Sequence, residues 1–439
     1  MANPIIDKSS SILIVGAGTF GLSTALELAR DGYTNIHCFD NYECPSPIAA
    51  GNDSNKIFDY DVHAPDEQIS PGLRIRLEAR DQWKADPIYS PFYHPVGFIF
   101  AACSEKILKK ETEKIRKLID KGIVDYEYLD SPEKFSKHIP VLKGELPGWK
   151  GYKLNKDDGW LHARNSLKSA YEECKRLGVK FTFGEDGNIL DVLADDANIA
   201  SIVTRSGKTF AGDRIVITAG ANAVKVLSFE KQLQAKCFTL AHFKVTEEEA
   251  EIFKGSPVMF NLQKGFFFEA DENLEIKVCN EFPGYTNLDS HDESIPWFTD
   301  EIPVEAEEGI REYLRETLPQ FADRPFVKTR SCWCTDSPNR ELIICEHPKF
   351  KNVVLGSGDS GKSFMLMPVI GKYISKVAIY GQDGLSEEDR EFWKWRPETA
   401  SDRDDEQSRY GGSGKVSDVK DIKKWVSASK PTPHEVKVE

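Results

Sequence analysis

Residues 11–21 read Ser-Ile-Leu-Ile-Val-Gly-Ala-Gly-Thr-Phe-Gly, an apolar run that meets three glycines at the spacing Gly-x-Gly-x-x-Gly. A second short apolar segment, residues 36–39, follows an amphipathic stretch and ends at Asp40. This order predicts a strand, a tight turn, a helix and a second strand, which is the fingerprint of a dinucleotide-binding unit. Asp40 is placed to accept both ribose hydroxyls, which disfavours NADP and leaves FAD or NAD.

Each residue of the glycine motif has a physical role. We expect Gly16 to permit the tight turn, Gly18 to let a pyrophosphate approach bare backbone, and Gly21 to let helix and strand pack closely. Thr19 and Phe20, between the glycines, are further expected cofactor contacts. The helix that follows offers free N–H groups and a positive dipole end at its N-terminus. The motif therefore predicts that this turn holds the phosphates of a cofactor.

Composition narrows the class of protein. At 439 residues the chain is too long for a single core, and its net charge of −14 argues against a nucleic-acid partner. No apolar run approaches the ~18 residues that span a bilayer, and no secretory signal is visible. The nine cysteines follow no secreted pattern, and the C-terminus is not a peroxisomal Ser-Lys-Leu address. We expect a cytoplasmic monomer that acts on a small molecule, without membrane or metal.

The dinucleotide-type pattern returns twice along the chain. After residues 214–218, a predicted strand, comes a second expected cofactor contact at Ala219 and Gly220, and residues 353–361 form a strand followed by a glycine-rich turn. The intervening segments are β-rich, with a predicted hairpin between residues 265–269 and 274–279. Because NAD dehydrogenases usually keep the nucleotide domain continuous, this interleaving favours FAD.

These patterns predict an α/β fold with a discontinuous, Rossmann-type FAD-binding domain and a β-rich α+β substrate domain. The predicted FAD-binding ranges are 1–62, 150–235 and 326–395, the substrate domain covers 63–149 and 236–325, and a tail over 396–439 wraps onto the body rather than packing into it. We also expect one charged amphipathic helix over residues 106–121.

Cys332 and Cys334 form a Cys-x-Cys pair whose chemistry the residues alone leave open. No second Cys/His pair at ligand spacing accompanies it, so a metal site is disfavoured, and a disulfide between the two would be strained. A structural thiol in a strand is the simplest interpretation of either residue.

Motifs that recur in one known family are spread nearly from end to end. They are GAGTFG (16–21), AGNDSNK (50–56), PGWKGY (147–152), GWLHAR (159–164), GFFFE (265–269), EIKVCNE (275–281), PGYTN (283–287), CWCTD (332–336) and GDSG (358–361). With these motifs the chain resembles the fungal fructosyl amino acid oxidases (amadoriases or fructosyl peptide oxidases), within the wider family of sarcosine-oxidase-like flavoproteins.

The resemblance implies a covalent FAD, held through a thioether between Cys332 and the 8α-methyl group of the flavin. It also implies that Lys277 lies over the flavin N5, hydrogen-bonded through water, where a fixed ammonium stabilises the superoxide formed from dioxygen. Lys56 matches a second basic residue near the flavin. Further cofactor contacts are implied in the glycine-rich turn after the strand that begins at residue 353. They are Gly358, Asp359, Ser360, Gly361 and Lys362.

At the substrate site the resemblance implies Glu281 and Arg409, the latter as the fork donor for an amino-acid carboxylate. The chain departs from the family at Met365, where a lysine usually helps to bind that carboxylate. Either Lys362 or Arg409 compensates, or the substrate differs.

The resemblance implies an oxidase of fructosyl amino acids that releases the amino acid, glucosone and hydrogen peroxide. The alternative is an oxidase of saccharopine, pipecolate or an N-methyl amino acid with the same flavin chemistry. A third possibility, of another class, is an NAD-dependent dehydrogenase or a nucleotide-binding protein without oxidase activity.

Overall fold

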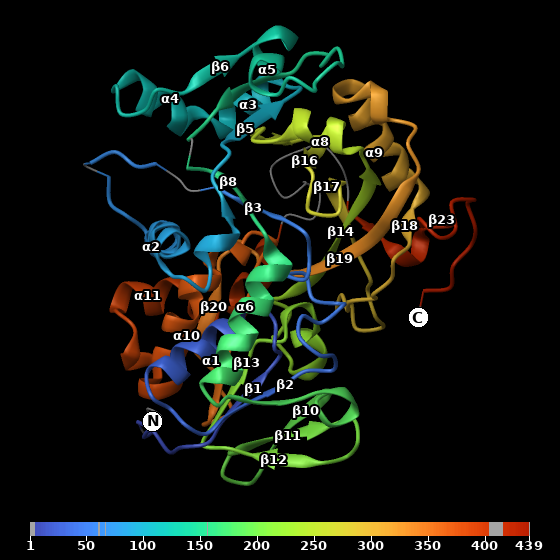
Figure 1. Cartoon of the computed structure of the whole chain (residues 1–439). Coiled ribbons are helices and arrows are strands. Elements are labelled where there is room, and N and C mark those ends of the chain that lie inside the picture. Colours follow the sequence, from blue (N-terminus) through green and yellow to red (C-terminus); the bar gives the residue numbers. More distant parts are fainter. Residues whose placement is uncertain (1–4, 60–61, 66, 156, 404–415, 439) are drawn as a thin grey trace.

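The computed structural model describes residues 5–59, 62–65, 67–155, 157–403 and 416–438. Two sheets dominate it, one below the other in the view of Figure 1. Among the described residues, no helix is both long and apolar enough to cross a membrane.

The first sheet has six strands in the order β20-β21-β13-β1-β2-β9, and all neighbours are parallel except β20 and β21. Its strands are β1 (Ile12–Val15), β2 (Ile36–Phe39), β9 (Lys180–Thr182), β13 (Arg214–Ile217), β20 (Ile343–Glu346) and β21 (Val353–Ser357). The helices α1 (Thr19–Arg30) and α10 (Met367–Tyr380) pack on it, and α6 (Ala163–Arg176) packs on α1. The four residues of β1 are all buried, as expected for a parallel strand covered on both faces.

The second sheet has nine strands, ordered β19-β14-β17-β16-β15-β5-β7-β6 with β22 added beside β17. These are β5 (Phe98–Ala102), β6 (Glu127–Leu129), β7 (Lys150–Lys153), β14 (Gln234–Lys244), β15 (Val258–Asn261), β16 (Gly265–Phe267), β17 (Glu275–Thr286), β19 (Phe326–Asp336) and β22 (Ser417–Asp418). Helix α9 (Val304–Thr317) packs on β14 and β17. The two sheets confirm the predicted Rossmann-type domain beside a β-rich domain.

Smaller elements complete the fold. There are three short sheets. The first contains β10 (Ile189–Ala194), β11 (Ala200–Thr204) and β12 (Thr209–Ala211), and the second contains β3 (Lys56–Phe58), β8 (Gly159–Leu161) and β4 (Tyr93–His94). The third pairs β18 (Ile302–Pro303) with β23 (Trp425–Val426). The remaining helices are α2 (Pro71–Ala85), α3 (Glu105–Glu111), α4 (Glu113–Asp120), α5 (Pro132–His138), α7 (Ala223–Val226), α8 (Glu247–Phe253) and α11 (Glu387–Phe392). Helices α3 to α5 form the upper rim in Figure 1.

The hairpin predicted over residues 265–279 is confirmed, since β16 and β17 are antiparallel with Phe266 opposite Cys279. The single helix predicted over 106–121 is wrong, because it divides into α3 and α4 at Thr112. The Thr112 side chain is buried, and its hydroxyl donates to the carbonyl of Leu108 at 2.5 Å, which competes with helix propagation.

Residues 416–438 of the C-terminal tail pack into the body, whereas the sequence predicted that the tail would wrap. Strand β22 pairs with β17 and β23 pairs with β18, and Trp425 is fully buried.

The domain boundaries given in the sequence analysis remain a prediction. Strands β7 and β19 fall in ranges expected for the FAD-binding domain, yet both pair in the nine-stranded sheet.

Candidate active site

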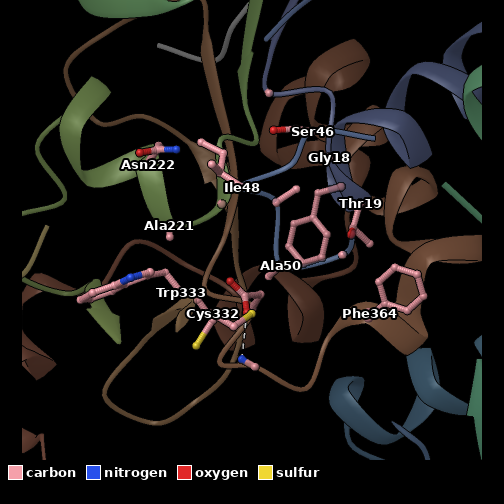
Figure 2. A pocket seen from close by; sticks show the side chains of 18 of the residues that line it. Gly18, Thr19, Ser46, Ile48, Ala50, Ala221, Asn222, Cys332, Trp333 and Phe364 are labelled. Atoms are coloured by element: carbon pink, nitrogen blue, oxygen red, sulfur yellow. Dashed lines mark hydrogen bonds between the residues drawn. The ribbon is translucent and has the colours of Figure 1, made fainter. Parts of the chain in front are cut away.

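A cavity of about 600 Å³ lies between the two sheets, at the carboxyl ends of β1, β13 and β21. Open α/β sheets bind their ligands at this end of the strands. Figure 2 shows Cys332 beside Trp333 on one side of the cavity and Thr19 on the other. The predicted site residues in its wall are Gly16, Gly18, Thr19, Phe20, Asp40, Lys56, Ala219, Gly220, Lys277, Cys332, Asp359, Gly361, Lys362 and Met365.

The turn between β1 and α1 is shaped for a phosphate. Gly16 has a φ of +99°, and a Cβ there would lie 2.6 Å from the carbonyl oxygen of Thr218. A Cβ on Gly21 would lie 1.8 Å from the carbonyl oxygen of Gly16, so helix and turn are in direct contact at that point. A Cβ on Gly18, by contrast, would meet no protein atom within 4 Å.

The N-terminus of α1 opens at this turn without a side-chain cap and without an acidic residue in its first turn. A helix end of this kind binds the phosphates of a dinucleotide. The uncapped helix, the bare backbone at Gly18 and the size of the cavity together fit FAD.

Asp40 lies at the end of β2, and its carboxylate is already engaged with backbone. One oxygen accepts the N–H of Ala17 at 2.9 Å and the other accepts that of Tyr42 at 3.2 Å. Burial raises the pKa of Asp40, while these N–H donors act against the rise. The carboxylate therefore anchors the glycine turn, and its remaining lone pairs are available to ribose hydroxyls.

The turn after β21 is tied to β19 by Asp359. Its carboxylate accepts the backbone N–H and the hydroxyl of Thr335, both at 3.0 Å, and the N–H of Gly361 at 2.8 Å. Gly358 and Ser360 shape this turn with positive φ angles and lie outside the described cavity wall, as does Gly21 of the first turn. Gly21, Gly358 and Ser360 therefore shape the two turns beside the cavity without lining it.

Two lysines in the cavity wall share one buried carboxylate. The Nζ of Lys277 donates to Asp53 at 2.6 Å and to the carbonyl oxygen of Asn55 at 2.8 Å. The Nζ of Lys56 lies 2.9 Å from the same oxygen of Asp53. The side chains of Asp53 and Lys277 are each only 2% exposed. This cluster brings a net charge of +1 to the cavity.

The charges of this cluster stabilise one another. Burial alone would raise the pKa of Asp53, but Lys277 and Lys56 hold it well below its usual range. Burial likewise opposes the charge of Lys56, yet the Asp53 carboxylate raises the pKa of that lysine overall. The Asp53 carboxylate therefore fixes the position of both lysine side chains beside the cavity.

Two arginines hold the loop that carries Asp53. The guanidinium of Arg330 donates to the carbonyl oxygens of Asn52 and Ala49, each at 2.8 Å. The backbone N–H of Arg164 donates to the carbonyl of Asp53 at 2.8 Å. The sequence analysis assigned no role to Asp53 or to either arginine. Asp53 lies three residues before Lys56, and this spacing could have indicated an ion pair between them.

Cys332 and Cys334 have different surroundings on β19. Cys332 is half-buried and lies in the cavity wall. Cys334 is 5% exposed, and its sulfur contacts the carbonyl oxygen of Lys236 at 3.5 Å. Cys332 is thus accessible to a group in the cavity, whereas Cys334 is packed like a structural thiol.

The residues expected at the substrate end are only partly described. Met365 lies in the cavity wall and is 4% exposed. Lys362 lies beside it, but its ammonium is 3.3 Å from Glu341 and burial lowers its pKa. The side chain of Glu281 and the whole of Arg409 lie outside the described residues.

Comparisons with known proteins agree with this geometry. The model of the FAD-dependent oxidoreductase family matches residues 11–377. L-saccharopine oxidase of Schizosaccharomyces pombe is 30% identical over 417 residues, which cover 88% of this chain and 93% of that protein.

Among solved structures, the fructosamine oxidase Amadoriase II of Aspergillus fumigatus, in complex with FSA, is 40% identical with a TM-score of 0.88 over 99% of both chains. Amadoriase I of the same organism is 34% identical, also with a TM-score of 0.88, over 97% of this chain and 99% of that one. These likenesses confirm the resemblance inferred from the sequence motifs. The chain belongs to the family of FAD-dependent oxidoreductases.

Proposed function

We propose that this chain is an FAD-dependent oxidase of fructosyl amino acids. The observation that carries the substrate class is the 40% identity to Amadoriase II, in complex with FSA, over 99% of both chains. The fixed ammonium groups beside the cofactor cavity support the oxidase half of the proposal.

The reaction oxidises a secondary amine at its C–N bond. The substrate loses two electrons and two protons to become an imine, which water hydrolyses to glucosone and the free amino acid. Dioxygen takes up two electrons and two protons and leaves as hydrogen peroxide. FAD, when bound, supplies the hydride acceptor and passes the electrons to dioxygen.

Lys277 stabilises the negative charge that develops as dioxygen is reduced. Its ammonium is held in place by Asp53 and by the carbonyl of Asn55, so no reorganisation is needed when that charge appears. Lys56 adds a second positive charge on the same carboxylate. Asp53 acts as the positioning residue for both lysines.

We propose that Cys332 holds the cofactor covalently, as a thioether to the 8α-methyl carbon. Its half-buried thiol in the cavity wall supports this assignment. The glycine turn and α1 would hold the pyrophosphate, and Asp40 the ribose. We propose contacts with the rest of the cofactor for Ala219, Gly220, Asp359, Gly361 and Lys362, in a turn that Gly358 and Ser360 shape.

A second candidate substrate is saccharopine or a related secondary amine. The relative that is 30% identical is named L-saccharopine oxidase, and Met365 leaves a neutral side chain where the resemblance predicts a lysine. Lys362 is engaged by Glu341. We therefore propose Arg409 as the group that binds the carboxylate of a fructosyl amino acid, and Glu281 as a further substrate-binding residue.

Peroxide release from a panel of fructosyl-valine, fructosyl-lysine, saccharopine, pipecolate and sarcosine tests the proposal. We expect the fructosyl compounds to be turned over with the highest kcat/KM. Faster turnover of saccharopine than of any fructosyl compound would transfer the assignment to the second candidate. A protein without bound flavin would contradict both. We also propose that the protein is cytoplasmic and monomeric, as expected from its sequence.

A further inference from the structure

A second cavity, of about 520 Å³, lies beside the cofactor cavity, and the two share Ile48 and Phe298 in their walls. The charged residues of its lining are Lys328 and Arg330 on β19 and Asp300. Asp300 is exposed, whereas Lys328 is half-buried and Arg330 is buried. Positive charge therefore predominates inside this cavity.

Lys328 belongs to a row of basic side chains that crosses three strands. In the register of the nine-stranded sheet, His242 on β14 lies opposite Lys277 on β17 and opposite Lys328 on β19. Side chains at directly opposite positions project from the same face of a sheet. The row therefore runs from the cofactor cavity, where Lys277 lies, to the second cavity.

The ammonium of Lys328 has no hydrogen bond or ion pair within the described part of the chain, unlike those of Lys277 and Lys56. The neighbouring acids are already engaged. Asp53 accepts from both lysines of the cofactor cavity, and Glu275 accepts from the Nδ1 of His242 at 3.0 Å.

Burial lowers the pKa of Lys328, and the nearby charges of Arg164 and Arg330 act in the same direction. The carboxylates of Asp53 and Glu275 oppose this shift without offsetting it. A half-buried cation without a direct ion-pair partner among the described residues is costly, and an anion entering the cavity would reduce that cost.

The remaining lining supplies donors and an apolar wall. Two N–H groups of Arg330 are used by Ala49 and Asn52, which leaves others of its five free to donate. The Thr299 hydroxyl oxygen accepts the N–H of Glu301 at 3.1 Å, so its own hydrogen can be donated. The apolar part of the wall is formed by Pro47, Ile48, Phe298, Val327 and Ala428.

We propose that this second cavity binds a small organic carboxylate with an apolar body, whose carboxylate lies between Lys328 and Arg330. The cavity is far larger than a halide ion needs, and its apolar wall suits a hydrocarbon chain. This site is separate from the oxidase reaction and does not depend on which amine is the substrate.

Isothermal titration calorimetry of the flavin-loaded enzyme tests the proposal without turnover. The probes are 3-methylbutanoate and 3-methylbutan-1-ol, which have the same apolar body with and without the charge. We expect the carboxylate to bind and the alcohol to bind at least tenfold more weakly, because a charge-assisted hydrogen bond is lost.

Two variants of Lys328 locate the binding. Lys328→Met is expected to weaken binding of the carboxylate at least tenfold, while Lys328→Arg retains it. Lys351→Met removes one charge from an exposed lysine on the surface and should leave the affinity unchanged. Equal binding of acid and alcohol, or binding that survives Lys328→Met in full, overturns the proposal.

Discussion

Substituting Lys277 by methionine removes the ammonium but keeps a side chain of similar length. The methionine would lie near the rings of Phe266 and Phe268, whose centroids are 5.9 Å and 5.1 Å from the present Nζ. Asp53 keeps its contact with Lys56 at 2.9 Å, so the carboxylate is not left without a partner. The variant is therefore expected to fold and to bind FAD.

The size of the effect follows from how firmly the ammonium is held. Removing one preorganised group that stabilises developing charge costs about 10²–10³ in rate, or roughly 2.7–4 kcal/mol. Lys277 is 2% exposed and is fixed by two hydrogen bonds, so we expect this full range for the reaction with dioxygen. Breaking a buried ion pair costs roughly 3–5 kcal/mol of stability, and the remaining contact of Lys56 favours the lower end.

Stopped-flow absorbance separates the two halves of the reaction. Reduction of the bound FAD by substrate is followed without oxygen, and reoxidation is then followed after mixing with dioxygen. Lys277→Met is expected to slow reoxidation at least a hundredfold, with the rate of reduction by substrate changed by less than about tenfold. The control is Lys244→Met, which removes an exposed lysine from the neighbouring strand β14.

An unchanged rate of reoxidation in Lys277→Met, with FAD bound, would refute the role assigned to this lysine. A loss confined to reduction by substrate would refute it equally, because the ammonium would then act on the amine. Equal losses in Lys277→Met and in the control would show that the effect is general electrostatics rather than the fixed charge beside the cavity.

Four further predictions concern the cofactor and the substrate. Cys332→Ala should release FAD on acid precipitation, whereas the wild-type protein should retain it. Gly18→Ala should fold normally but bind FAD weakly, while Gly21→Ala, whose Cβ would lie 1.8 Å from a carbonyl oxygen, should lower the Tm. Because the folded pKa of Asp53 is depressed, its stabilising effect is present above its unfolded pKa and is lost as the pH falls through the folded value. Asp53→Asn should thus lower the free energy of unfolding by roughly 3–5 kcal/mol at pH 7, and denaturant unfolding should show this gap closing below about pH 4. Met365→Lys should raise kcat/KM for fructosyl-valine about tenfold, since a charge-assisted hydrogen bond to its carboxylate is gained; an unchanged ratio of fructosyl-valine to fructosylamine turnover would contradict it.

The nucleotide-binding half was predictable because its determinants are local. A buried strand, a glycine turn and a helix occupy residues 12–30, and each imposes its requirement on near neighbours. The hairpin of β16 and β17 was predictable for the same reason, since its two strands are close in the chain. Where the fold depended on a tertiary contact, the sequence pattern failed. Thr112 interrupts a helical pattern because its side chain is buried, and Trp425 draws the tail into the core.

The charge cluster could not be deduced from any window of the sequence. Lys277 and Asp53 are 224 positions apart, and the motif that contains each is plausible without the other. The resemblance implied a role for Lys277 but did not show which group pairs with its buried ammonium. That group is the Asp53 carboxylate, shared with Lys56, which meets Lys277 only when β17 packs against the loop before β3.

Arg330 explains how these distant segments are kept in register. Arg330 lies two residues before Cys332 on β19. Its guanidinium donates to the carbonyl oxygens of Ala49 and Asn52, in the loop that carries Asp53. The thiol proposed to hold the flavin and the carboxylate that positions both lysines are therefore connected by one side chain. The two contacts come from the two terminal nitrogens of one planar guanidinium, a fork geometry that the single nitrogen of a lysine does not reproduce. If Cys332 holds the flavin as proposed, one packing interaction, which lies outside the motifs for phosphate binding, connects the attachment point of the cofactor with the charge cluster beside it.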